Sequence, residues 1–504
     1  MHTRGTYGKL MQGTAAVLGT AVLLAGCGGT KSEGTGASAS PQSSAPAASA
    51  KAPEKEVKLT MWVKSTPEEQ ELFKTEAAAF KKDNPAITVE IVPFGTDQYI
   101  SALQAAISGS SLPDIFQLAP QIPLTQLKKL DLVQPLAFDQ KYMDQFEDGT
   151  WLAGKTTLDN KPYVWPNRSF KTAASVMFYN KKVMRDMGLN PDKPPATWDE
   201  LAAQAKIVTD KGGGSIYGIS AGLKQDWFVE QLVQQMATSV DGKGIQSVAD
   251  FARMTDWKTG TLFQPNAVKV TAEAFKQWMA NKIINPNALI WTSAESAASF
   301  GEGKAAFDLE GQWQLAFFKS KYPNLEFGVA MLPSKSGTPS YYGTVGGSET
   351  GFVVSKKAAN MEATTKWLTY LTQQHYINAA QKYIALSPLK NADATNVGPE
   401  WKQIVDVSNQ MFRVVPAPWV KNPVELDVMT ALKAKTAKQP LGATLQTYWN
   451  NGNVNLDKYL ADYAAEQQTF LQDAVKSVQG AKLEDWSFPN WDINTNFTQD
   501  KYGK

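Results

Sequence analysis

Cysteine and histidine are almost missing from this chain of 504 residues. One cysteine, Cys27, excludes an internal disulfide and a cysteine-built metal cluster. Two histidines, His2 and His375, are too few for a histidine-built metal site, so we expect no metal and no cofactor. An excess of charge of one sign is missing as well. The chain has 50 basic and 48 acidic residues, and we therefore expect no nucleic-acid partner.

A membrane-spanning run near the start of the chain is missing too. The apolar segment at residues 10–26 is slightly short for a spanning helix. The residues before it carry Arg4 and Lys9 and no acid. A basic start, a short apolar run and small residues before a cleavage point are typical of a secretory signal peptide, which we assign to residues 1–26.

The end of this run, Leu24-Ala25-Gly26-Cys27, resembles the lipobox of bacterial lipoproteins. The resemblance implies cleavage before Cys27 and acylation of its thiol, with palmitate among the acyl groups. Two acyl chains hold a protein stably at a membrane. We therefore expect a lipid anchor on the extracellular face of the cell membrane, or in the periplasm if an outer membrane exists. An ordinary signal peptide with an unrelated cysteine is the alternative.

Residues 27–56 are dominated by Ser, Ala, Gly and Pro, and from Gly28 on they contain no aromatic or large aliphatic residue. Such a segment cannot bury enough apolar surface to order itself, so we expect a disordered tether. The rest of the chain is different. With 43% apolar residues over 504, the sequence is long enough for two or more folded units.

Strand and helix patterns alternate at the start of the folded part. Residues 57–63, 87–94 and 114–119 have strand composition. The first helix between them begins with Thr66 as N-cap, Pro67 at the first helical position and Glu69 completing a capping box. This alternation predicts a parallel sheet flanked by helices, with ligands at the carboxyl ends of its strands. Trp62 and residues 117–120 would lie at that edge.

The alternation continues along the chain, and residues after 390 are mainly helical in pattern. Further strands are predicted at 175–180, 215–220, 304–311 and 349–356, and further helices at 197–208, 226–237 and 361–383.

Six stretches, in this order, resemble the extracellular solute-binding proteins of ABC importers, the family that includes maltose-binding protein. They are LTMWV at 59–63, NPAITVEI at 84–91, SGSSLPDIF at 108–116, FYNKKVMRDMGLNPDKPPATWDEL at 178–201, GEGKAAFDLEGQW at 301–313 and GGSETGFVVSKKAANMEATTKWLTYLT at 346–372. They are spread over nearly the whole mature chain.

The resemblance implies an α/β fold of two lobes, each a mostly parallel sheet flanked by helices, with the ligand in the cleft between them. Lobe 1 would comprise residues 57–168 with 345–386, and lobe 2 residues 169–344 with 387–504. Crossing strands would lie near 165–172, 340–347 and 384–390. Hinge closure around a carbohydrate, delivery to the permease subunits of an ABC importer, and a monomeric state follow from the same resemblance.

Aromatic rings stack on the apolar faces of sugars, and polar side chains bond their hydroxyls. By matching the family's segments, we expect ligand contacts from Trp62, Gln117, Asn167, Arg168, Asp226, Trp227, Trp313, Gly346, Gly347 and Trp419. Asp226 also fits a helix N-cap, and the two glycines also fit a plain turn. Asp114 fits a structural role on a backbone amide. The family's acid near residues 173–174 has no clear match here.

An enzyme is the rival class. Gly218–Gly222, GISAG, fits the nucleophile elbow of α/β-hydrolases, with Ser220, Asp308 and His375 in the required order. The pattern is weak in a chain with 36 glycines, and no helix pattern begins directly after Ser220. A glycosidase needs two carboxylates at a set separation, which the sequence does not single out. We expect no enzyme.

Two alternatives keep the binding fold. One is a sensor or adhesin in place of a transport protein, which the sequence does not separate from an importer subunit. The other is a different solute, such as a polyamine, a metal or phosphate. The scarcity of histidine argues against a metal, and Asp226 alone is too few carboxylates for a polyamine. Trp62, Trp227, Trp313 and Trp419 favour an oligosaccharide.

Overall fold

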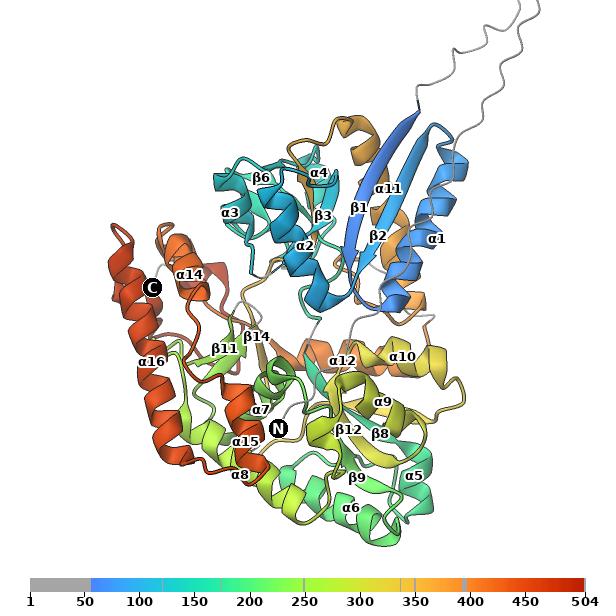
Figure 1. Ribbon diagram of the computed structural model, residues 1–504, viewed down its shortest axis with the longest axis vertical. Helices are drawn as coiled ribbons and strands as arrows, with labels where there is room; N and C mark the ends of the chain where they lie inside the picture. Colours follow the sequence, from blue (N-terminus) through green and yellow to red (C-terminus); the bar gives the residue numbers. More distant parts are fainter. Residues whose placement is uncertain are drawn as a thin grey trace, which may run out of the picture. The chain divides into compact units, whose positions relative to one another are not determined.

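The computed structural model describes residues 56–119, 121–172, 174–247, 250–335, 337–348, 350–391 and 397–502. The chain divides into two units, Met1–Glu54 and Lys55–Lys504, and every described element belongs to the second (Figure 1). The expected signal peptide, Cys27 and all of the expected tether except Glu56 lie outside the described residues.

The first sheet joins N-terminal strands to a strand from far along the chain. Its order is β2-β1-β3-β15-β4, and β7 pairs with β15. The strands are β1 (Val57–Lys64), β2 (Ile87–Phe94), β3 (Ile115–Gln117), β4 (Val133–Gln134), β7 (Val164–Trp165) and β15 (Phe352–Ser355). The accompanying helices are α1 (Pro67–Asp83), α2 (Thr96–Ser108), α3 (Leu124–Lys129), α4 (Gln140–Met143) and α11 (Met361–Gln381). Helix α1 packs against both β2 and α11 (Figure 1).

Helix α1 begins where the sequence predicts, but its first turn differs. Thr66 is the N-cap, its hydroxyl accepts a hydrogen bond from the Glu69 backbone N–H, and Pro67 occupies the first helical position. Phe73 and Phe80 are buried on one face, as their helical spacing predicts. The predicted capping box is wrong, because the Glu69 carboxylate does not bond back to the N-cap. It bonds to Asn167 and Arg168 instead.

The second sheet has the order β13-β8-β12-β9. Its strands are β8 (Ser175–Asn180), β9 (Tyr217–Ser220), β12 (Ala305–Gly311) and β13 (Phe327–Ala330). The helices around it are α5 (Lys181–Asp186), α6 (Trp198–Lys211), α7 (Asp226–Asp241), α8 (Pro265–Ala280), α9 (Ser293–Gly301), α10 (Gln314–Lys321), α12 (Pro399–Met411) and α15 (Leu441–Trp449). β8 and β12 are buried along their whole length, because helices cover both faces of the sheet (Figure 1).

A third, smaller sheet has the order β11-β10-β14-β16. Its strands are β10 (Ile245–Ser247), β11 (Asp250–Thr255), β14 (Tyr342–Thr344) and β16 (Phe412–Val414), and the helices of this region are α13 (Pro418–Lys421), α14 (Glu425–Lys433) and α16 (Leu456–Ser477). A separate aromatic core contains Trp257, Trp486, Phe488 and Trp491. A short hairpin of β5 (Thr157–Leu158) and β6 (Lys161–Pro162) completes the strands, and single turns of 3₁₀ helix lie at Ala288–Ile290, Leu483–Trp486 and Gln499–Lys501.

The strand pairing corrects one expectation. The α/β class with helix-flanked sheets is confirmed, but the sheets are mixed and not mostly parallel. β1 pairs in parallel with β2 and β3, whereas β15 is antiparallel to β3, β4 and β7. β8 is antiparallel to both β12 and β13. The sequence pattern predicts parallel pairing only for a strand that follows its neighbour through a helix crossover. β15 comes from a distant segment of the chain, so the pattern does not fix its direction.

Candidate functional site

The carboxyl end of the first sheet holds the first group of predicted residues. Trp62 on β1 is half-buried, and its ring centroid lies 4.8 Å from that of Phe94. Gln117 is buried at the end of β3, where its Oε1 accepts a hydrogen bond of 2.8 Å from the Lys64 backbone N–H. The Asp114 carboxylate accepts one of 2.9 Å from the Thr60 backbone N–H. Gln117 and Asp114 therefore fasten β1 to β3 and fix where β1 ends.

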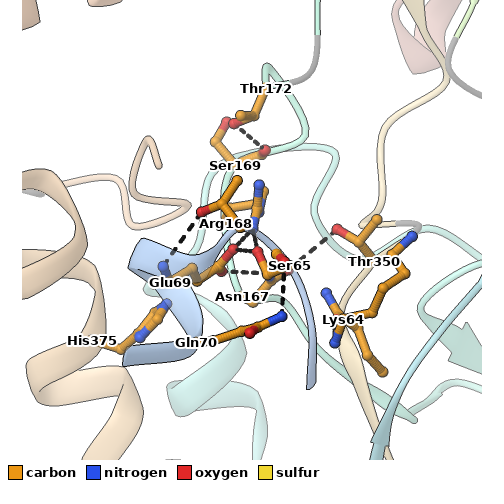
Figure 2. Close-up of polar contacts among 12 residues, drawn as sticks. Lys64, Ser65, Glu69, Gln70, Asn167, Arg168, Ser169, Thr172, Thr350 and His375 are labelled. Carbon is orange, nitrogen blue, oxygen red and sulfur yellow. Dashed lines mark hydrogen bonds and ion pairs between the residues drawn. The ribbon is translucent and has the colours of Figure 1, made fainter. Parts of the chain in front are cut away.

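A polar cluster follows directly, at the N-terminus of α1 (Figure 2). Glu69 is buried and accepts hydrogen bonds from Ser65, from Asn167 Nδ2 at 3.2 Å and from the Arg168 guanidinium. Asn167 Oδ1 in turn accepts a hydrogen bond of 3.4 Å from the Thr350 hydroxyl. The cluster thus connects α1 to two segments that are distant in sequence, around 167–168 and 350.

Lys64 is the last residue of β1 and has a lowered pKa. Burial lowers it most, the nearby Arg168 guanidinium lowers it further, and Glu69 partly raises it. Among the residues that the structure describes, none accepts a hydrogen bond from the Lys64 amino group or forms an ion pair with it.

An aromatic group lies at the start of α7. The rings of Trp227 and Trp313 are 5.9 Å apart between centroids, and that of Phe228 lies 5.6 Å from Trp227 and 6.2 Å from Trp313. Trp227 is 45% exposed, which is unusual for a large aromatic side chain. Trp313, which precedes α10, covers Gly311, and a Cβ at Gly311 would lie 2.1 Å from the indole. Two predicted stacking residues are therefore brought together.

Asp226 is exposed beside this pair. It is the first residue of α7, and Gln225 precedes it as the N-cap. The carboxylate of Asp226 is therefore placed in the positive end of the helix dipole without capping the helix itself.

Beneath the aromatic group, β12 carries two buried acids with no basic partner among the described residues. Asp308 Oδ1 accepts hydrogen bonds from the hydroxyls of Ser220 at 2.6 Å and Ser296 at 2.8 Å. Glu310 accepts bonds from the Ser293 hydroxyl at 2.6 Å and the Gly222 backbone N–H at 3.1 Å. Burial raises the pKa of both carboxyls, and the proximity of Asp308 raises that of Glu310 further.

Trp419 lies apart from the Trp227–Trp313 pair. It is buried in the third core, and its indole N–H donates a hydrogen bond of 2.9 Å to the Ala153 carbonyl. Its remaining exposed edge borders a mostly apolar pocket. The lining residues come from the segment after β3, from the 154–155 turn, from α13 and α14, and from position 348: Leu118, Ala119, Pro123, Leu124, Thr125, Gly154, Lys155, Ser348, Trp419, Leu426, Met429, Thr430 and Lys433.

Gly346 and Gly347 have positive φ angles of 88° and 68°. A Cβ at Gly346 would lie 2.6 Å from the Gly149 carbonyl oxygen, and the Gly347 N–H donates a hydrogen bond of 2.7 Å to the same oxygen. The two glycines therefore permit a close backbone approach, and the backbone that approaches them is that of the chain itself.

The sequence profile of a family described as "Bacterial extracellular solute-binding protein" matches residues 64–374, more than half of the chain. The chain belongs to this family. The matched range includes Lys64 at the end of β1, the polar cluster and the Trp227–Trp313 pair.

Relatives agree with this assignment. A binding protein of Brucella abortus (strain 2308) is 24% identical over 374 residues, which cover 68% of this chain and 84% of that one. An ABC transporter extracellular-binding protein of Pyrococcus horikoshii is 24% identical over 364 residues, which cover 69% of this chain and 76% of that one. The sn-glycerol-3-phosphate-binding periplasmic protein of Yersinia enterocolitica is 26% identical over a shorter region, with 41% and 45% covered.

Solved structures share the two-lobe fold. The GacH receptor of Streptomyces glaucescens, solved unliganded and with acarbose, has a TM-score of 0.63 at 17% identity and covers 83% of this chain and 100% of its own. Maltose-bound MalE3 of T. maritima has a TM-score of 0.62 at 18% identity, and the match covers 82% of this chain and 99% of that one. At this identity the likeness shows the fold alone, which is the two-lobe α/β fold predicted from the sequence.

The hydrolase alternative fails on geometry as well as on family. Ser220 is buried and donates to Asp308, but His375 lies on α11 in another core, 2.9 Å from the Glu76 carboxylate through Nδ1. Helix α7 begins only at Asp226, so Ser220 is not at a strand-to-helix elbow. The expectation that the chain is not an enzyme is confirmed, because the family to which it belongs consists of solute-binding proteins.

No group of three or more Asp, Glu, His or Cys side chains within the described residues could hold a metal ion. None of the helices in the described ranges has both the length and the apolar character needed to cross a membrane.

Lys64, Ser65 and Glu69 are not among the predicted site residues. Glu69 has the sequence spacing of a local capping residue, and only the fold brings Arg168 to it. The sequence could have indicated Lys64, because it follows Trp62 by two positions and a strand places such residues on the same face. A charged residue at the carboxyl end of a strand, on the face of a predicted ligand residue, is a candidate by that rule.

Proposed function

We propose that this chain is the carbohydrate-binding subunit of an ABC importer, held by a lipid on Cys27 at the extracellular face of the cell membrane. It captures an oligosaccharide between lobe 1, residues 57–168 with 345–386, and lobe 2, residues 169–344 with 387–504. The lobes close around the solute by a hinge motion, and the closed form delivers it to the permease subunits.

The observation that carries the proposal is the pair of Trp227 and Trp313. An indole that is 45% exposed next to a second indole offers two apolar ring faces to a ligand. Sugars present apolar C–H faces of matching size, and a buried aromatic core would not leave a tryptophan so exposed. Trp62, Asp226 and Arg168 are the further ligand contacts that we propose.

The comparisons support a carbohydrate and an importer. The similar structures include proteins solved with stachyose, acarbose or maltose bound, and a chitin oligosaccharide binding protein. The Pyrococcus horikoshii relative is described as part of an ABC transporter. These proteins differ from this chain at most positions, so the solute itself has to be found by experiment.

A panel of solutes scored by thermal unfolding and tryptophan fluorescence tests the proposal. Maltose, maltotriose, chitobiose, stachyose, spermidine, glutamate and sn-glycerol 3-phosphate are added to the full chain. A solute at about 100 times its dissociation constant adds about 2.7 kcal/mol to the free energy of unfolding. We expect at least one oligosaccharide to raise the unfolding temperature and change the fluorescence. Shifts with spermidine or glutamate and none with any carbohydrate would overturn it.

A further inference from the structure

The carboxyl end of β1 carries a cation without a counter-charge of its own. The Lys64 backbone is fixed by the hydrogen bond from its N–H to Gln117. Its side chain is partly buried, and no described residue bonds or pairs with its amino group. Partial removal of an ammonium group from water is unfavourable for its charged form, and burial accordingly lowers the pKa of Lys64.

Arg168 adds a second cation to the same cluster. Its side chain is 19% exposed and pairs through Nη2 with Glu69, which is 1% exposed. Arg168 Nε is buried and has no hydrogen-bond acceptor among the described residues. Glu69 also accepts bonds from Ser65 and Asn167 (Figure 2). One described carboxylate therefore lies among two cations, and its oxygens are already occupied.

The position of this unbalanced charge points to a ligand. Parallel strands of an α/β sheet end at the edge where ligands bind, and β1 is parallel to both β2 and β3. Trp62, a proposed ligand contact, is two residues before Lys64 on the same face of β1. A solute that touches Trp62 is therefore directed toward Lys64, whose pKa is influenced by the nearby Arg168.

We propose that the carbohydrate bound by this chain carries an anionic group, a carboxylate or a phosphate, which pairs with Lys64 and Arg168. This inference rests on the proposed function and narrows its substrate class. The oxygens of such a group accept charge-assisted hydrogen bonds from the ammonium and the guanidinium, which a neutral sugar hydroxyl matches less well.

Paired probes test the charge separately from the carbohydrate. The affinity of the full chain for each probe is measured by titration calorimetry. The carbohydrate pairs are trigalacturonate with its methyl-esterified form, and glucose 6-phosphate with glucose. Two anions that are not carbohydrates, sn-glycerol 3-phosphate and inorganic phosphate, are measured beside them. We expect the acidic member of a carbohydrate pair to bind at least about tenfold tighter than the neutral one. We expect high salt to reduce that difference by screening.

Variants of β1 supply the controls. Lys64→Met should weaken binding of the acidic carbohydrate at least about tenfold and that of its neutral partner less than about twofold, and Lys64→Arg should restore most of the loss. Lys58→Met is the matched control, because Lys58 lies on the same face of β1 but pairs at the exposed surface with Glu90. It should change neither affinity.

The possible outcomes separate the two proposals. Equal binding of acidic and neutral carbohydrates, or an equal loss for both in Lys64→Met, would overturn the charge proposal and leave the carbohydrate proposal standing. Binding of sn-glycerol 3-phosphate or inorganic phosphate alone, with no carbohydrate bound, would overturn the carbohydrate proposal and, with it, the anionic carbohydrate. A preference for acidic carbohydrate that disappears in Lys64→Met supports both.

Discussion

At the residue scale, Trp227 is the side chain whose placement has the clearest functional consequence. It is 45% exposed and lies next to Trp313 at the start of α7. A large aromatic ring in that position is explained by a ligand better than by packing.

Replacing Trp227 by alanine should therefore separate binding from stability. We expect the affinity for the carbohydrate that binds the wild type to fall at least about tenfold, while the free energy of unfolding changes by less than about 1 kcal/mol. Urea unfolding and fluorescence titration measure the two quantities. Ile207→Ala is the control, because Ile207 is also exposed, at 40%, but lies on α6. A Trp227→Ala variant with unchanged affinity would contradict the stacking role.

Glu69 shows where reasoning from the sequence reaches its limit at this scale. Its position three residues after Thr66 predicts a capping box, and the N-cap itself is where the pattern puts it. The carboxylate turns to Arg168 because a buried charge gains more from a cationic partner than from a backbone N–H. That partner is 99 residues away in the chain, and local spacing carries no information about it.

The same difference gives a prediction about two helix caps. Thr197 and Glu200 form a complete capping box on α6, whereas Thr66 on α1 accepts a single bond of 3.4 Å. We expect Thr197→Ala to lower the free energy of unfolding by about 1 kcal/mol, and Thr66→Ala to lower it by less. Chemical denaturation measures both. A larger effect at Thr66 than at Thr197 would contradict the assignment of the caps.

At the element scale, the sequence predicts helices and buried strands well and the short strands poorly. α1, α6 and α11 have capping side chains and apolar faces that local rules capture, whereas α7 has an apolar face but no side-chain cap at its N-terminus. β14 and β16 are three residues long, and β14 pairs with β16 and with β10 across long stretches of the chain. Their pairing depends on tertiary contacts and has no local pattern.

The buried acids that connect β12 to α9 and β9 make stability depend on pH. The pKa of Asp308 and of Glu310 is raised in the folded chain, mainly by burial, so the folded state holds protons that the unfolded state releases. The contribution of these two acids to stability is then fully present below about pH 4, the ordinary carboxyl value, and is lost as pH rises through the raised values. The slope is about 1.4 kcal/mol per pH unit while one proton separates the two states.

Asp308→Asn should remove part of this dependence. Asparagine can still accept the bonds from Ser220 and Ser296 through Oδ1, and it cannot ionise. We expect the variant to unfold at a higher temperature than the wild type at pH 9, and to lose that advantage at pH 5. Thermal unfolding across this range checks it. A variant with the same pH profile as the wild type would show that Asp308 does not titrate in the folded chain.

At the scale of the whole molecule, the fold and the family follow from the order of elements. Six short stretches indicated the two-lobe solute-binding fold, and the family profile and the similar structures confirm it. The ligand contacts do not follow in the same way. Gln117 and Asn167 have the residue types expected of a sugar site, but each bonds to another part of the chain, and only the folded structure reveals those partners.

The proposed lipid anchor on Cys27 can be tested in cells. If Cys27 is the acylated residue, bacterial cells that express the full chain should incorporate labelled palmitate into it, and the Cys27→Ser variant should incorporate none. The reason is that the thiol supplies the attachment point for the acyl groups, and the chain has no other cysteine. Wild-type protein without label would contradict the anchor.

We propose that a carbohydrate binds this chain with its ring against Trp227 and Trp313, and that closure of the lobes brings the carboxyl end of β1 to the same ligand. The most direct measurement is a crystal structure of the chain with the carbohydrate that raises its unfolding temperature most. The account predicts a sugar face within van der Waals contact of at least one of the two indoles and a polar group of the ligand beside Lys64 or Arg168. A carbohydrate bound at another surface, with both indoles still exposed to solvent, would contradict it.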